Sequence, residues 1–136
     1  MKIKKIIKWI GIAAAGLLAA AGLLIGCFTY VTEYRIADID IAISPDGTYE
    51  LRYQSVGEPD FPFGDSHARF VLKEDARTVS KLQFDVANDG GVLHKNSWIV
   101  NWEDDCAEVI IFGSEQPDAL YTLYFDGRTE CFEPDA

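Results

Sequence analysis

The sequence is poor in the residues that build metal sites and nucleotide sites. It contains two histidines, His67 and His94, and three cysteines, and none of these has the spacing of zinc ligands. No glycine-rich loop leads into a helical segment with a lysine, which is the pattern of a phosphate-binding loop. We therefore expect no metal site and no cofactor.

Catalytic patterns are missing as well. Asp65, Ser66 and His67 are the nearest grouping of catalytic residue types, but consecutive residues of an extended chain point in opposite directions. Residues 103–105 and 85–89 are rich in oxygen ligands but lack the alternation of a calcium loop, so we interpret them as solvated turns. No spacing selects two carboxylates for glycoside hydrolysis. We expect no catalytic residue and no enzymatic activity.

Basic residues are scarce after residue 31. Residues 32–136 contain eight of the lysines and arginines and all 22 of the acidic residues, which gives this part a formal charge of −14. A surface of that charge repels nucleic-acid phosphates and anionic lipid headgroups. We expect no nucleic-acid partner.

The first 31 residues carry a different pattern. Lysines at positions 2, 4, 5 and 8 precede an uncharged segment of 23 residues, 9–31. As a helix this segment would be about 34 Å long, enough to cross a bilayer. Lysines beside a first membrane helix stay in the cytoplasm. The sequence therefore predicts a basic cytoplasmic tail (residues 1–8), a single transmembrane helix (residues 9–31) and an exported acidic domain (residues 32–136).

The apolar segment allows two further interpretations. Residues 24–27 (LIGC) fit a lipobox, which would make residues 9–31 a signal region with lipidation at Cys27. Against this, the apolar run is longer than the 7 to 15 residues of a usual signal core. The segment also has small residues at helical spacing, at Gly11, Ala15, Ala19, Gly22 and Gly26. Such a face allows a second helix to approach, so a helix-mediated homodimer is a further hypothesis.

Two cysteines remain in the predicted exported domain, Cys106 and Cys131. In an oxidising exterior they could form a disulfide, which would stabilise the fold by about 3 kcal/mol on the chain-entropy model. The alternative is two buried thiols that act as small apolar side chains. The sequence leaves both open, because a bridge needs α-carbons within about 7 Å.

The hydrophobic pattern between residues 34 and 132 repeats every two residues, in short runs separated by turn residues. In the first run we expect Ile39, Ile41 and Ile43 to share the buried face, and we expect the run 109–112 to be a central strand. About eight strands are predicted. The fold class is all-β: an antiparallel meander arranged as a small sandwich, a curved sheet or a partly open barrel.

The segment between residues 56 and 66 differs from an ordinary turn, because it places two phenylalanines among prolines. We expect the two rings to cap an open end of the sheet. The alternative is a stiff recognition loop, which would lose little entropy on binding. The candidate recognition residues are Glu58, Asp60, Phe61, Phe63, Asp65 and His67.

Three further motifs suggest a relationship: residues 44–49 (SPDGTY), residues 54–64 (QSVGEPDFPFG) and residues 87–90 (ANDG). Together they resemble a group of small, uncharacterised membrane-anchored proteins of Gram-positive bacteria. This resemblance implies an anchored, exported domain and supplies no catalytic or binding residue. We expect a non-enzymatic interaction or envelope-associated module with an unknown protein or envelope partner. The alternative is a cell-wall carbohydrate-binding or hydrolytic domain.

Overall fold

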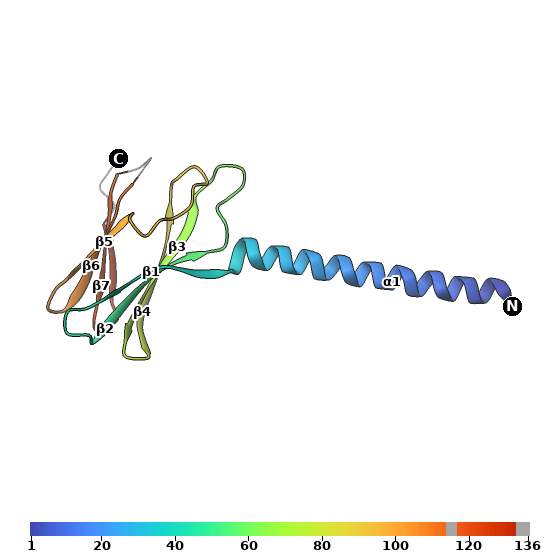
Figure 1. Cartoon of the computed structure of the whole chain (residues 1–136), viewed down its shortest axis with the longest axis horizontal. Coiled ribbons are helices and arrows are strands. Elements are labelled where there is room, and N and C mark those ends of the chain that lie inside the picture. Colours follow the sequence, from blue (N-terminus) through green and yellow to red (C-terminus); the bar gives the residue numbers. More distant parts are fainter. Residues whose placement is uncertain (114–116, 133–136) are drawn as a thin grey trace.

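The computed structural model describes residues 1–113 and 117–132, which form one long helix followed by an all-β body (Figure 1). Helix α1 (Lys2–Thr29) continues through a π-helical turn, η1 (Tyr30–Tyr34). The span Lys2–Tyr34 is long and apolar enough to cross a membrane, and no residue of α1 is buried. Residues 2–8, predicted as a separate tail, are helical and continuous with the apolar segment.

The described residues contain eight strands in two sheets of four. The first sheet has the order β1 (Ile36–Ile43), β2 (Tyr49–Val56), β3 (Ser66–Glu74) and β4 (Arg77–Val86). The second has the order β5 (Trp98–Trp102), β6 (Cys106–Ile111), β7 (Ala119–Tyr124) and β8 (Thr129–Phe132). Every neighbouring pair is antiparallel, so the predicted all-β meander is confirmed.

The two sheets pack face to face and share one core, which makes the fold a sandwich. The ring of Tyr53 lies 5.2 Å from that of Trp98, and the ring of Phe70 lies 5.7 Å from that of Tyr121. At one edge, the Trp98 indole N–H donates to Asp40 of the opposite sheet at 2.9 Å. Among the described residues no strand ladder joins the sheets, so the barrel alternative is not the one that forms.

Strand β1 departs from the predicted alternation. Its register shifts between Asp38 and Asp40, which leaves Ile39 in a β-bulge. Ile39 packs against the core, whereas Ile41 and Ile43 are 42% and 61% exposed. The predicted common face of the three isoleucines is therefore wrong, because one extra residue turns the following side chains to the other face.

Strand β6 holds an interior position in its sheet, between β5 and β7. Its residues Val109 and Ile111 are buried, and Phe112 follows the end of the strand. The prediction of a central strand in this part of the sequence is confirmed.

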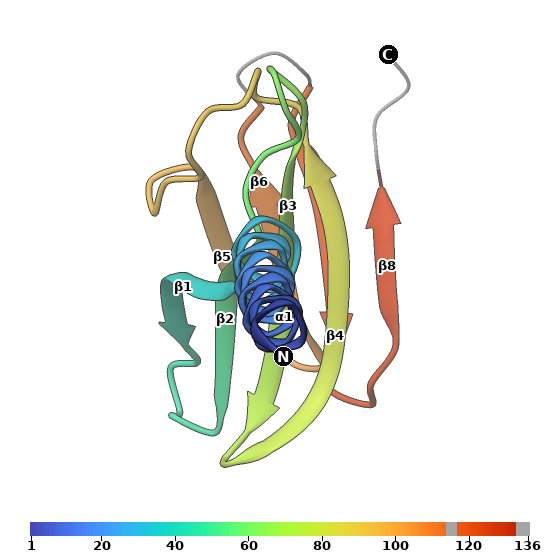
Figure 2. The ribbon, with the colours of Figure 1, turned by 90° about the vertical axis from the view of Figure 1, so that its right-hand side faces the viewer.

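The helix joins the first sheet almost without a linker, because Arg35 alone separates η1 from β1. The Gly57 N–H donates to the Arg35 carbonyl, and the Glu58 N–H donates to the Thr32 carbonyl, both at 2.7 Å. Seen end-on, α1 projects from the outer side of the β1–β4 sheet (Figure 2). The outer face of this sheet is therefore turned toward the helix, and the β5–β8 sheet lies behind it.

Candidate functional sites: the aromatic loop and the distal cleft

The aromatic loop, defined here as residues 57–65, connects β2 to β3 beside the end of the helix (Figure 1). Its two rings are exposed, Phe61 by 96% and Phe63 by 75%. The prediction that they cap an end of the sheet is wrong. The physical reason is that the backbone bonds from Gly57 and Glu58 direct the loop to the helix instead of across the sandwich.

His67 connects the aromatic loop to the sheet. Its Nδ1 lies 2.7 Å from an Asp85 carboxylate oxygen on β4, and its Nε2 lies 3.0 Å from a carboxylate oxygen of Asp60 in the loop. These two bonds, that to Asp85 first, raise the pKa of His67 and favour the imidazolium form. The loop is closed on itself by the Asp60 N–H, which donates to the Asp65 carbonyl at 3.0 Å.

The six predicted recognition residues therefore divide into two groups. Asp60 and His67 contact each other and hold the loop in place. The other four, Glu58, Phe61, Phe63 and Asp65, are exposed. The partner that sequence analysis missed is Asp85, because cross-strand register alone places it opposite His67.

Ser66 and His67 do not form a catalytic pair. The buried Ser66 hydroxyl lies 3.0 Å from both the Asn88 side-chain oxygen and the Gly91 carbonyl. The neighbouring His67 side chain points to the other face of β3, where it meets Asp60 and Asp85. Ser66 thus serves to fix the chain that follows β4.

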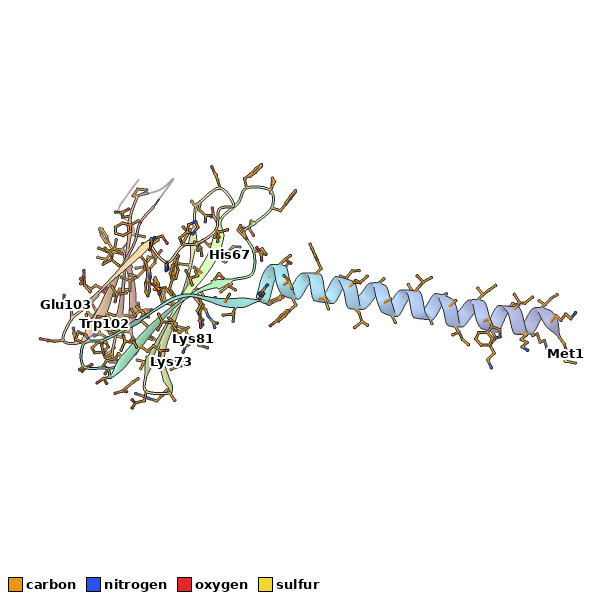
Figure 3. All side chains as sticks on the ribbon, viewed as in Figure 1. Met1, His67, Lys73, Lys81, Trp102 and Glu103 are labelled. Carbon is orange, nitrogen blue, oxygen red and sulfur yellow. The ribbon has the colours of Figure 1, made fainter. Side chains whose placement is uncertain are left out.

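A second candidate site, not predicted from the sequence, is a cleft of about 360 Å³ on the side of the sandwich away from α1 (Figure 3). We call it the distal cleft. The Tyr49 and Phe125 rings stack with centroids 3.8 Å apart, and the Trp102 ring lies 6.5 Å from that of Phe125. The turns after β1, β5 and β7 meet here. The complete lining is Ser44, Pro45, Asp46, Tyr49, Trp102, Glu103, Asp104 and Phe125.

Carboxylates surround the rings of the distal cleft. Asp46 accepts a hydrogen bond from the Ser44 hydroxyl at 2.6 Å and another from the Thr48 N–H at 3.0 Å. These bonds, that from Ser44 first, lower the pKa of Asp46. Glu103 and Asp104 add two more carboxyl groups, and no basic residue is among the described residues that line the cleft. Aromatic faces beside carboxyl groups suit a cationic or hydroxyl-rich ligand.

The distal cleft has a partial signal in the sequence. Asp46 precedes Tyr49 by three positions in one turn, and Trp102 directly precedes Glu103 in another, so each turn pairs an acid with a ring. What the sequence does not reveal is that the two turns belong to different sheets and meet at one end of the sandwich. Among the described residues, no group of three or more histidine, cysteine or acidic side chains is arranged to hold a metal ion.

The register excludes the disulfide between Cys106 and Cys131. Cys106 on β6 lies opposite Tyr124 of β7, and Cys131 on β8 lies opposite Tyr121 of β7. The whole of β7 lies between them, which separates the two strands by ~10 Å, more than a bridge allows. Burial raises the pKa of the Cys106 thiol to about 11. The buried-thiol interpretation holds for Cys106 and is wrong for Cys131, which is exposed.

The predicted features of the helix stay predictions. Cys27 is exposed within the continuous helix α1. A side chain built at Gly11, Gly22 or Gly26 would meet no atom within 4 Å, so the small-residue face is open. Neither lipidation at Cys27 nor pairing with a second helix is decided by this geometry.

Comparison with protein-family models, curated proteins and solved structures finds no match to this chain. The resemblance to small membrane-anchored proteins therefore stays a prediction, and the evidence on function lies in the geometry of the two sites.

Proposed function

We propose that this chain is a single-pass membrane protein whose sandwich lies outside the cell and acts as a non-enzymatic interaction module. The observation that carries the proposal is the distal cleft, in which the rings of Tyr49, Trp102 and Phe125 lie beside three carboxyl groups. The cleft lies on the side away from α1, where a partner can reach it without meeting the membrane (Figure 3).

The charge pattern supports this orientation. The lysines of the first eight residues stand at the start of the membrane-spanning helix, and lysines in that position are retained in the cytoplasm. The sandwich follows the other end of the helix and belongs on the opposite side. Its acidic composition suits a soluble domain in contact with water.

A cationic group on a partner, such as a lysine or arginine side chain, is the ligand class that the distal cleft fits best. Cation–π contact contributes about 0.5–2 kcal/mol for each well-placed ring. The ionised Asp46 and the neighbouring Glu103 and Asp104 add electrostatic attraction. Because the pKa of Asp46 is lowered, this residue acts as a carboxylate and is unsuited to donate a proton in catalysis.

A cell-wall carbohydrate is the second candidate ligand. The near-parallel stack of Tyr49 and Phe125, with planes 6° apart, offers a flat apolar edge, and the carboxylates can accept hydrogen bonds from sugar hydroxyls. Hydrolysis of such a polymer would also require a carboxyl group that keeps its proton near neutral pH. The lowered pKa of Asp46 makes this residue unsuited to that proton-donor role.

The test uses the full chain in lipid nanodiscs, with a soluble lysine–glycine peptide as one probe and soluble wall-glycan fragments as the other. We expect the double substitution E103Q/D104N to weaken peptide binding at least five-fold in calorimetry. The matched control D89N/E108Q removes two charges outside the cleft and should leave binding unchanged. Equal peptide binding by all three proteins, or binding of the glycan alone, would overturn the cationic-ligand proposal.

A further inference from the structure

We infer that the sandwich rests on the membrane surface, with the aromatic loop inserted among the headgroups and the outer face of the β1–β4 sheet against anionic lipids. The occupant proposed for this face is the surface of the bilayer that α1 crosses. The inference is independent of the ligand of the distal cleft, which lies on the opposite side of the sandwich.

The first support is the position of the aromatic loop along the helix axis. The uncharged segment ends at Val31, and Tyr30 and Tyr34 are 60% and 61% exposed at this end of the helix. Exposed tyrosines at the end of a membrane helix lie at headgroup level. The loop begins with Gly57 and Glu58 hydrogen-bonded to the same turn, so its base lies at the membrane interface.

The second support is the exposure of the two rings on a held loop. Phe61 and Phe63 are among the most exposed large hydrophobic side chains of the sandwich, at 96% and 75%. The loop that carries them is fixed by the helix end on one side and by the Asp60–His67 contact on the other. Little further ordering is required to insert the rings, and removal of both from water is favourable.

The third support is the charge of the sheet face turned toward the helix. Register places Arg52, Arg69, Lys73 and Lys81 on this outer face, which is half of the eight basic residues in residues 32–136. It places three acidic residues, Asp38, Glu50 and Asp85, on the same face. Figure 3 shows Lys73 and Lys81 on the helix side of the sandwich. Arg52 is neutralised by Asp38 and Glu50, whereas neither lysine has an ion pair among the described residues.

The same outer face also carries apolar groups that water does not favour. The bulge in β1 turns Ile41 and Ile43 outward, opposite Arg52 and Glu50 of β2. Basic side chains next to exposed isoleucines are the composition of surfaces that lie in a membrane interface. The net negative charge of residues 32–136 predicts repulsion from anionic lipids, but on this face the four basic side chains outnumber Asp38, Glu50 and Asp85.

The test uses the full chain in vesicles of seven parts phosphatidylcholine to three parts phosphatidylglycerol, with Trp9→Phe to remove the helix tryptophan. In this background, F61W places a fluorescent probe in the loop, and the control I99W places one on an exposed site of the other sheet. Lipids brominated on their acyl chains should quench the added emission of F61W at least twice as strongly as that of I99W. Equal quenching would overturn the insertion of the loop.

A second arm tests the basic face. The reversal K73E/K81E should reduce the bromolipid quenching of F61W at least two-fold in the anionic vesicles and leave it unchanged in phosphatidylcholine alone. The control K95E/R128E makes the same change in net charge elsewhere in the sandwich and should have no effect. Equal quenching in both variants would overturn the contact with anionic lipid. Peptide binding by the distal cleft should be the same throughout, which separates this inference from the proposed function.

Discussion

Replacement of Gly57 by alanine should release the aromatic loop from the end of the helix. Gly57 has a φ of +68°, and a Cβ atom there would clash with the Thr32 carbonyl oxygen. A left-handed conformation costs a non-glycine residue about 1–2 kcal/mol. The two backbone bonds from Gly57 and Glu58 to the helix end contribute about 0.5–1.5 kcal/mol each. The total is about 2–5 kcal/mol of local stability.

Hydrogen exchange of the Glu58 amide measures this effect directly, because that amide is protected by its bond to Thr32. Each 1.4 kcal/mol corresponds to a tenfold change, so G57A should speed the exchange at least ~30-fold. The matched control is G47A, since Gly47 also has a positive φ, +75°, but a Cβ there would meet no atom within 4 Å. If G57A left the Glu58 amide as protected as G47A does, the proposed attachment of loop to helix would be refuted.

Three further outcomes are expected. Phe70→Ala removes a fully buried ring between the sheets and should cost about 3–5 kcal/mol, measured as a lower midpoint in denaturant unfolding. The raised pKa of His67 means that its bonds to Asp60 and Asp85 stabilise the loop fully below about pH 6.5, and that this contribution is lost as the pH rises through the folded-state value. The loop amides should therefore exchange faster in H67Q than in the native chain at low pH, after correction for intrinsic rates, and the difference should vanish at high pH. Mass spectrometry after brief alkylation of the native protein should find Cys131 modified and Cys106 unmodified, because Cys106 is buried with a raised pKa.

The fold class follows from local features of the sequence. Side chains that alternate between two faces require a sheet with one buried side, and the turn residues between the runs set the hairpins. Asp126 and Gly127 illustrate this: the Gly127 N–H bonds to the Tyr124 carbonyl, and the turn joins β7 to β8 as the sequence predicts. The choice of a sandwich over a curved sheet or a barrel depends on which faces meet, and no local pattern contains that information.

Several features could not be predicted from local sequence patterns, because they depend on contacts between distant segments. In the sequence, Ile39 belongs to a regular alternation. The bulge that turns Ile41 and Ile43 to the outer face appears only when β1 is paired with β2. Phe61 and Phe63 read as cover for the sheet, and their exposure results from the attachment of Gly57 to the helix end. The distal cleft likewise needs turns from both sheets.

A β-sandwich has two outer faces. In this protein the short junction after the helix turns one of them, the outer face of the β1–β4 sheet, toward the helix. A formal charge of −14 would oppose contact with an anionic membrane if all of it acted on the lipid. At physiological salt, charges act over about 8 Å, whereas two packed sheets lie about 10 Å apart. Glu103 and Asp104, which follow β5 in the second sheet, are therefore screened from a membrane on the helix side, where Lys73 and Lys81 lie (Figure 3). One acidic domain can thus present to lipid the partly apolar face that carries Lys73 and Lys81, and to a partner an acidic, aromatic cleft, because the helix fixes which face is which.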